Sequence, residues 1–299
     1  MKMRITLLFE RSDKQDSGWR EHFFHFTWGY LFPSIREILR LGVSESEKII
    51  FEVETCGPVM DNITLEAATI LNLNIRIVEV REKEPNSWIN IPRWDKILRN
   101  CTDWYIRNQK PLPDHDTEAV LPPEVISDGE QFISDIYTVR NAFLSTTNTE
   151  GESSGFLIMK RSDEPAYYKP DGGAIRPTYG NSRRALTGVE DTVQELQKQG
   201  LRVQSFEPGK VLLAEQINVF HRSEGVIGIR GAEFSNLIWA NPGTKVLMIE
   251  PTGMPVHGVQ HMLAAILKQP FVCLKSDERT SFPKLTSDMI TPYLPVNPL

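Results

Sequence analysis

Short apolar segments alternate with longer amphipathic segments along the chain, most regularly after residue 155. There, apolar runs of about five residues are separated by stretches of about ten residues with helical spacing. This alternation predicts βαβ units and a parallel sheet. The predicted strands cover residues 156–159, 201–206, 225–229, 245–249 and 271–274, and the main helices cover 188–199, 212–221 and 258–267.

The N-terminal half shows the same alternation less cleanly. A helical pattern runs over residues 21–41, where we expect Pro33 to interrupt the helix and Gly42 to end it. The remaining predicted elements are strands at 5–9, 48–53 and 74–80 and helices at 63–73, 94–108 and 127–143. The sequence therefore predicts an α/β protein made of two Rossmann-like halves.

A stretch without large apolar residues, STTNTEGESS at residues 145–154, is the best linker in the chain. It divides an N-terminal domain, residues 1–150, from a C-terminal domain, residues 151–275. The tail, residues 276–299, could return to the N-terminal domain.

The composition, 40% hydrophobic and 24% charged, is that of a globular protein. A net charge of −6 argues against a general nucleic-acid binder, because phosphate backbones need a basic surface. Cys56, Cys101 and Cys273 form no CxxC pair, so they are expected to be reduced thiols rather than zinc ligands or disulfides.

No apolar run approaches the roughly 18 residues of a membrane span, and the run at residues 5–9 is too short for a signal peptide. The expected location is the cytoplasm, and loose attachment to a membrane surface is compatible with the sequence. The oligomeric state is left open.

The sharpest chemical signal is GVIGIRGAEFSN at residues 225–236, where an apolar strand runs into a turn of small residues. Arg230 follows the strand's carboxyl end, where ligands collect in open α/β sheets. Gly231 and Ala232 would let a ligand approach the backbone, and Ser235 and Asn236 would lie at a helix N-terminus that attracts phosphate. The alternative is a tight structural turn.

Glu250 ends the next strand, in the sequence VLMIEP, and could accept hydrogen bonds from ribose hydroxyls. Basic residues gather at two other places. Arg161 follows the strand at 156–159, and Arg183 and Arg184 follow a Gly/Pro-rich loop. Guanidinium groups suit a pyrophosphate, although a solvated charge cluster is the simpler explanation. Neither GxGxxG nor a Walker lysine motif occurs, which argues against classical dinucleotide and P-loop sites.

Two histidines, His22 and His25, share one helix face in the segment EHFFHFTW. They could be metal ligands, a catalytic base or core residues, and no nearby third ligand supports a metal. His25 is the candidate general base, because imidazole titrates near neutral pH.

Several of these features together resemble glycosyltransferase family 61. They are Arg161 after a strand, Arg184, Glu190 at a helix start, LAEQ at residues 213–216, and the segments GVIGIRGAEFSN and IEP. The resemblance covers residues 161–251 well. The aromatic segment at residues 21–33, with its histidine, resembles the family more loosely.

This resemblance implies a GT-B architecture and inverting sugar transfer without a required metal or other cofactor. The C-terminal domain would bind the nucleotide-sugar donor, a UDP-sugar, and the N-terminal domain would face a glycan or lipid-linked acceptor in polysaccharide biosynthesis. Arg161 and Arg184 would contact the diphosphate, and Glu250 would hold the ribose. The donor pocket would be lined by Gly231, Ala232, Ser235 and Asn236.

The sequence departs from the family pattern at two positions. Arg230 replaces the motif's histidine, and Glu233 replaces a glycine. Arg230 could neutralise phosphate but cannot act as a base, because its pKa is too high. Two alternatives follow: a degenerate transferase-like protein that binds a glycan or partner, and another nucleotide-binding α/β enzyme.

Overall fold

The computed structural model describes residues 3–9, 22–42, 49–79, 88–117, 121–163, 180–251, 258–276 and 280–294. Its contacts divide the chain into two compact units. Unit 1 comprises Met1–Pro113, Glu118–Thr149 and Leu212–Asn218, and unit 2 comprises Asp114–Thr117, Glu150–Val211 and Val219–Leu299.

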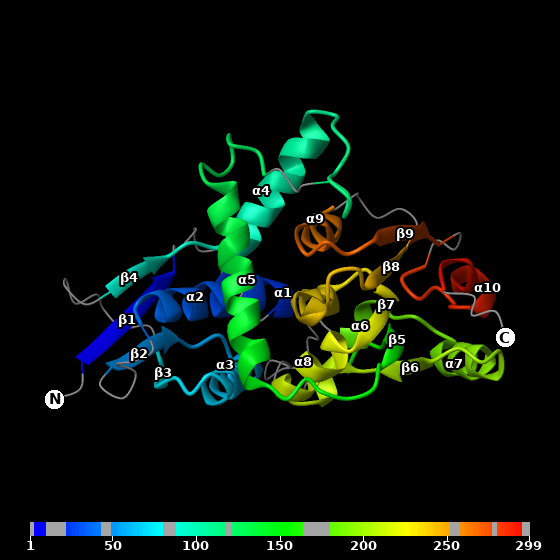
Figure 1. Ribbon diagram of the computed structural model, residues 1–299, viewed down its shortest axis with the longest axis horizontal. Coiled ribbons are helices and arrows are strands. Elements are labelled where there is room, and N and C mark those ends of the chain that lie inside the picture. Colours follow the sequence, from blue (N-terminus) through cyan, green and yellow to red (C-terminus); the bar gives the residue numbers. More distant parts are fainter. Residues whose placement is uncertain are drawn as a thin grey trace, which may run out of the picture. The chain divides into compact units, whose positions relative to one another are not determined.

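Unit 1 contains a parallel four-stranded sheet with the order β3-β2-β1-β4 (Figure 1). The strands are β1 (Met3–Phe9), β2 (Ile49–Glu54), β3 (Ile75–Val78) and β4 (Trp88–Ile91). The sequence analysis missed β4, a short strand. The helical segments are α1 (Phe23–Phe26), η2 (Thr27–Leu31), α2 (Phe32–Arg40), α3 (Pro58–Ile70), α4 (Trp94–Arg107) and α5 (Gly129–Thr146).

The first helical run of unit 1 passes through Pro33 without a break, contrary to the expected interruption. Proline lacks an N–H and crowds the carbonyl four residues earlier, which here belongs to Gly29. The chain forms a π-helical segment, η2, immediately before this point. Its wider turn offers a physical reason why Pro33 is accommodated at the start of α2. The run ends as expected at Gly42, which has a left-handed φ of 88°.

Unit 2 contains a parallel five-stranded sheet with the order β6-β5-β7-β8-β9 (Figure 1). The strands are β5 (Gly155–Met159), β6 (Val203–Phe206), β7 (Ser223–Ile229), β8 (Lys245–Glu250) and β9 (Phe271–Lys275). The helices are α6 (Gly180–Arg183), α7 (Val189–Lys198), η5 (Pro208–Lys210), η6 (Ala232–Trp239), α9 (Val259–Ile266), α10 (Ser287–Ile290) and η7 (Thr291–Tyr293). Helix α8 (Leu213–His221) is divided between the units, because Leu212–Asn218 belongs to unit 1.

These two parallel sheets with their crossover helices confirm the expected fold class, an α/β protein with two Rossmann-like units, the components of the GT-B type. Each strand order has one point where the direction of winding reverses. In unit 2 this switch point lies between β5 and β7, and in unit 1 it lies between β1 and β4. Ligands of such sheets bind outside the carboxyl ends of the strands at this point.

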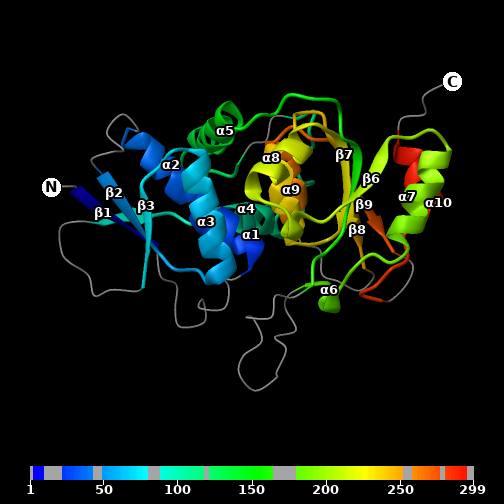
Figure 2. The ribbon, with the colours of Figure 1, turned by 90° about the horizontal axis from the view of Figure 1, so that it is seen from below.

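The described part of the tail packs within unit 2, which corrects the idea that it returns to the N-terminal domain. Leu285, Ile290 and Leu294 are buried in the same core as α7 and the sheet. Both ribbon views draw α10 beside α7 (Figures 1 and 2). A pair of backbone hydrogen bonds anchors the tail, from Thr187 N–H to the carbonyl of Pro283 and from Leu285 N–H to that of Thr187. The apolar side chains of the tail complete this core.

We therefore expect Ile290→Ala to lower the free energy of unfolding by about 2–5 kcal/mol, because it removes a fully buried side chain and leaves a cavity. Urea denaturation measures the change. The neighbouring exposed Asp288→Ala is the control and should stay within about 0.5 kcal/mol. A loss as small for Ile290→Ala as for the control would contradict the packing of the tail.

Candidate active site

Four arginines gather near the carboxyl edge of the sheet in unit 2, and we call them the arginine cluster: Arg161, Arg183, Arg184 and Arg230. Arg161 follows β5 and Arg230 follows β7, so these two flank the switch point. The side chains of Arg161 and Arg230 are 6% and 5% exposed, and Arg184 is also buried. The structure thus brings together the four arginines named in the sequence analysis, of which Arg161, Arg184 and Arg230 were the predicted donor-site residues.

The members of the cluster repel one another. Burial first, and then the charges of Arg161, Arg183 and Arg230, lower the pKa of Arg184 to about 10, against a smaller opposing effect of Glu233. The pKa of Arg183 is lowered by burial and by the charges of Arg161 and Arg230. Guanidinium groups that are desolvated beside like charges favour an anion at this edge of the sheet.

Two carboxylates hold members of the cluster in place. Arg230 donates from Nη1 to Oε1 of Glu250 across 2.5 Å, in a pair that is buried on both sides. Arg161 donates from Nε to Oε1 of Glu233 across 2.8 Å. Glu250, expected to bind ribose, has one oxygen engaged by Arg230, while its Oε2 lies 3.8 Å from Sγ of Cys273.

The turn after β7 differs in detail from the expectation. The helix that follows is a 3₁₀ helix that begins at Ala232, with Gly231 as its N-cap residue. Ser235 and Asn236 therefore lie within the helix and not at its N-terminus, which corrects the sequence analysis. Both are 1% exposed, and Oγ of Ser235 and Nδ2 of Asn236 have no hydrogen-bond partner among the described residues.

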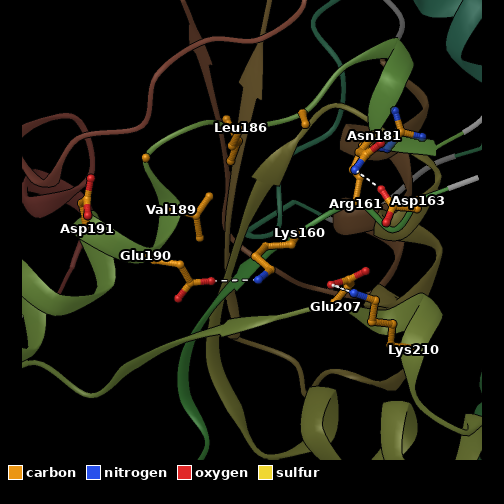
Figure 3. A pocket seen from close by; sticks show the side chains of 12 residues that line it. Lys160, Arg161, Asp163, Asn181, Leu186, Val189, Glu190, Asp191, Glu207 and Lys210 are labelled. Atoms are coloured by element: carbon orange, nitrogen blue, oxygen red, sulfur yellow. Dashed lines mark hydrogen bonds and ion pairs between the residues drawn. The ribbon is translucent and has the colours of Figure 1, made fainter.

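A polar pocket of about 480 Å³ opens on the same unit, between the ends of β5 and β6 and the start of α7 (Figure 3). Of the predicted donor residues, Arg161 lines it. Its walls carry paired polar groups: Lys160 with Glu190 at 2.8 Å, Lys210 with Glu207 at 3.1 Å, and Asn181 with Asp163 at 2.5 Å. The lining residues are Lys160, Arg161, Asp163, Asn181, Ala185, Leu186, Gly188, Val189, Glu190, Asp191, Glu207 and Lys210.

Sequence reasoning missed most of this lining. Glu207 and Lys210 directly follow β6, and Asp163 follows β5 at a short distance, so position at a strand's carboxyl end was the available signal. Glu190 pairs with Lys160 at the pocket wall, and its side chain stays 58% exposed. Part of the Gly/Pro-rich loop, residues 170–182, lies outside the described residues.

In unit 1, His25 forms a buried pair with Asp95. Its Nδ1 lies 2.7 Å from Oδ2 of Asp95, and His25 is 7% exposed. Nη2 of Arg99 lies 3.4 Å from the other ring nitrogen, Nε2. A guanidinium can only donate, so these partners fit a neutral imidazole with its proton on Nδ1 and its lone pair on Nε2.

Asp95 is itself held by a buried arginine. Arg93 donates from Nε to Oδ1 across 3.1 Å and from Nη2 to Oδ2 across 2.7 Å, the bidentate geometry of a strong ion pair. Burial lowers the pKa of His25, while the hydrogen bond and charge of Asp95 raise it. The net effect is a pKa below the usual 6.5, so His25 is neutral at neutral pH. A general base requires this protonation state.

This group also lies at a switch point. Arg93, Asp95 and Arg99 follow β4, and His25 is on the first helix after β1, so the two strands that flank the reversal in unit 1 supply them. The sequence analysis found His25 but not its partners, because it did not detect β4.

The two units thus define an α/β protein with a cationic sheet edge suited to an anionic ligand and a separate histidine–aspartate pair suited to proton transfer. A family model described as "Glycosyltransferase 61" matches residues 69–247, more than half of the chain. The chain belongs to glycosyltransferase family 61, and it is a glycosyltransferase.

Comparison with solved structures gives a further similarity. No curated protein matches the sequence significantly. The chain is similar to the Escherichia coli heptosyltransferase WaaC with ADP, at 11% identity and a TM-score of 0.37, over 97% of this chain and 96% of that one. Among the described residues, none of the helices combines the length and apolar character needed to cross a membrane.

We expect Asp95→Asn to lower the pKa of His25 further below 6.5, because the change removes the charge that raises it against burial. A histidine titration followed by NMR measures this. Asp103→Asn, at an exposed site on the same helix, is the control and should leave the pKa unchanged. A raised His25 pKa in Asp95→Asn would contradict the pairing.

Proposed function

We propose that this glycosyltransferase transfers a sugar from a UDP-sugar to a hydroxyl of a glycan or lipid-linked acceptor, with inversion, in polysaccharide biosynthesis. The observation that carries the proposal is the arginine cluster at the switch point of unit 2. The resemblance of the sequence to its family supports the choice of a UDP-sugar. A cytoplasmic location with loose membrane attachment belongs to the same proposal.

The chemistry of the reaction explains the need for the cluster. When the bond between the sugar and the diphosphate breaks, negative charge grows on the departing diphosphate. Guanidinium groups fixed beforehand at that position stabilise this charge without reorganising water. Arg161, Arg184 and Arg230 would contact the diphosphate. Glu250, through Arg230, would fix one of these groups in place.

The rest of the donor is assigned to neighbouring groups. Gly231 and Ala232 would lie against it, and the buried Ser235 and Asn236 carry polar atoms that lack partners among the described residues. The second oxygen of Glu250, which accepts a weak hydrogen bond from Sγ of Cys273 at 3.8 Å, would also accept a hydrogen bond from the ribose.

Inversion needs a base on the acceptor hydroxyl rather than a second nucleophile. His25 would serve as this base, accepting the proton at Nε2 while Asp95 stabilises the imidazolium that forms. Arg99, which lies against Nε2, would give way to the acceptor hydroxyl or help to orient it. No metal is needed in this scheme.

The first test concerns the donor site. UDP at about 100 times its Kd should raise the melting temperature of the protein by about 5 °C, because ligand binding stabilises the folded state. Arg184→Gln should weaken UDP binding about tenfold or more through loss of a charged partner. Arg202→Gln, an exposed arginine of the same unit, is the matched control and should bind like the wild type.

The same assay separates the alternatives. A shift with NAD but not with UDP would favour another nucleotide-binding α/β enzyme. If the folded protein shows no thermal shift with UDP, GDP, CMP or NAD, the result would favour a transferase-like binding protein without turnover. Equal UDP affinities of Arg184→Gln and Arg202→Gln would remove the diphosphate role of the cluster.

The second test concerns the base. His25→Gln should slow hydrolysis or transfer of a UDP-sugar roughly 100- to 10,000-fold, the usual contribution of general base catalysis, with UDP affinity unchanged. His22→Gln, one helical turn away, is the control and should retain activity within about threefold, since His25 is the residue proposed as the base and pairs with Asp95. Unchanged turnover in His25→Gln would exclude this residue as the base.

A further inference from the structure

Glu233 lies where a bound anion was expected. A Cβ atom added to Gly231 would collide with Oε2 of Glu233, so the carboxylate folds back over the backbone of the turn. Gly231 has an extended backbone, with φ of −171°, which any residue can adopt. The glycine therefore provides space rather than an unusual conformation, and the carboxylate of Glu233 fills that space.

The pair between Arg161 and Glu233 is incomplete. Nε of Arg161 binds Oε1 of Glu233, but Nη1 of Arg161 and Oε2 of Glu233 are both buried without a hydrogen-bond partner among the described residues. A buried donor or acceptor without a partner costs free energy. The Nε–H of a guanidinium points away from Nη1, so one carboxylate cannot reach both donors, whereas the several oxygens of a diphosphate can reach each of them.

The charges of the cluster also indicate that Glu233 occupies the place of an anion. Glu233 acts on Arg184 as an opposite charge, against the repulsion from Arg161, Arg183 and Arg230. Its carboxylate therefore acts as a counterion within the cluster. A dianionic diphosphate would supply the same compensation together with the second acceptor that Arg161 lacks.

We propose that Glu233 is an internal counterion that the diphosphate of the donor displaces from Arg161. This inference rests on the proposed function. Oxygens of the diphosphate replace Glu233 at Nε of Arg161 and supply an acceptor to Nη1, and the carboxylate leaves the space over Gly231. Because the ligand must break an existing ion pair, Glu233 lowers the affinity of the site for anions. Weakly charged anions are disfavoured most, since they compete least well with the carboxylate for Arg161.

Calorimetry with UDP and with inorganic pyrophosphate tests this on the full chain. Glu233→Gln should bind both probes about tenfold more tightly than the wild type, because the neutral amide competes poorly for a guanidinium. Glu224→Gln removes a carboxylate from another ion pair in the same unit, the one with Arg202, and should change affinity by at most about twofold, since that pair is largely exposed. Glu233→Ala should show the same tightening and replaces the Gln variant if that one fails to fold.

Weaker or equal binding by folded Glu233→Gln would overturn the proposal, because it would mean that the carboxylate supports Arg161 or accepts a hydrogen bond from the ligand. Equal tightening in Glu224→Gln would also overturn it, since the effect would then be general electrostatics. Tightening for pyrophosphate in a protein that does not bind UDP would support the counterion and refute the proposed donor. Binding of neither probe by any variant would refute both.

Discussion

The structure of unit 2 depends on one physical constraint, the burial of several guanidinium groups next to one another. Desolvation and mutual repulsion lower the pKa of Arg184 to about 10, so the folded protein keeps these charges together at a cost. Carboxylates offset part of that cost, Glu250 at Arg230 and Glu233 at Arg161. Such a cluster has a physical rationale as a site for an anion, and a diphosphate is the anion that sugar transfer would supply.

The topology of the sheets explains where the charged groups lie. Both units reverse their winding once, between β5 and β7 in one and between β1 and β4 in the other. At these points the crossover connections leave in opposite directions, and polar side chains after the strands can meet. Unit 2 places cations there, and unit 1 places a neutral histidine held by Asp95. The proposed reaction must stabilise a leaving group and accept a proton. A separate set of side chains serves each purpose, and each set lies at the switch point of its own sheet.

Much of the fold was predictable, because periodicity and apolar runs determine the strands and helices of unit 2 and most of those of unit 1. The short strand β4 was missed, and with it Asp95 and its neighbours, since no residue pattern marks a pairing between residues that are 70 positions apart. Arg161 and Arg230 were found from their positions after strands, and Arg184 from its position after the Gly/Pro-rich loop. The ion pair between Arg161 and Glu233 was not, because the folding back of one side chain over Gly231 is a matter of packing. For the same reason the sequence did not reveal that the tail completes the core of unit 2.

The central claim is that the arginine cluster binds a diphosphate. The most direct measurement is a crystal structure of the protein grown with UDP. Our account predicts diphosphate oxygens within hydrogen-bond distance of the guanidinium groups of Arg161, Arg184 and Arg230, at the carboxyl ends of β5 and β7. A nucleotide bound elsewhere on the chain, with these arginines still paired only to protein groups, would contradict it.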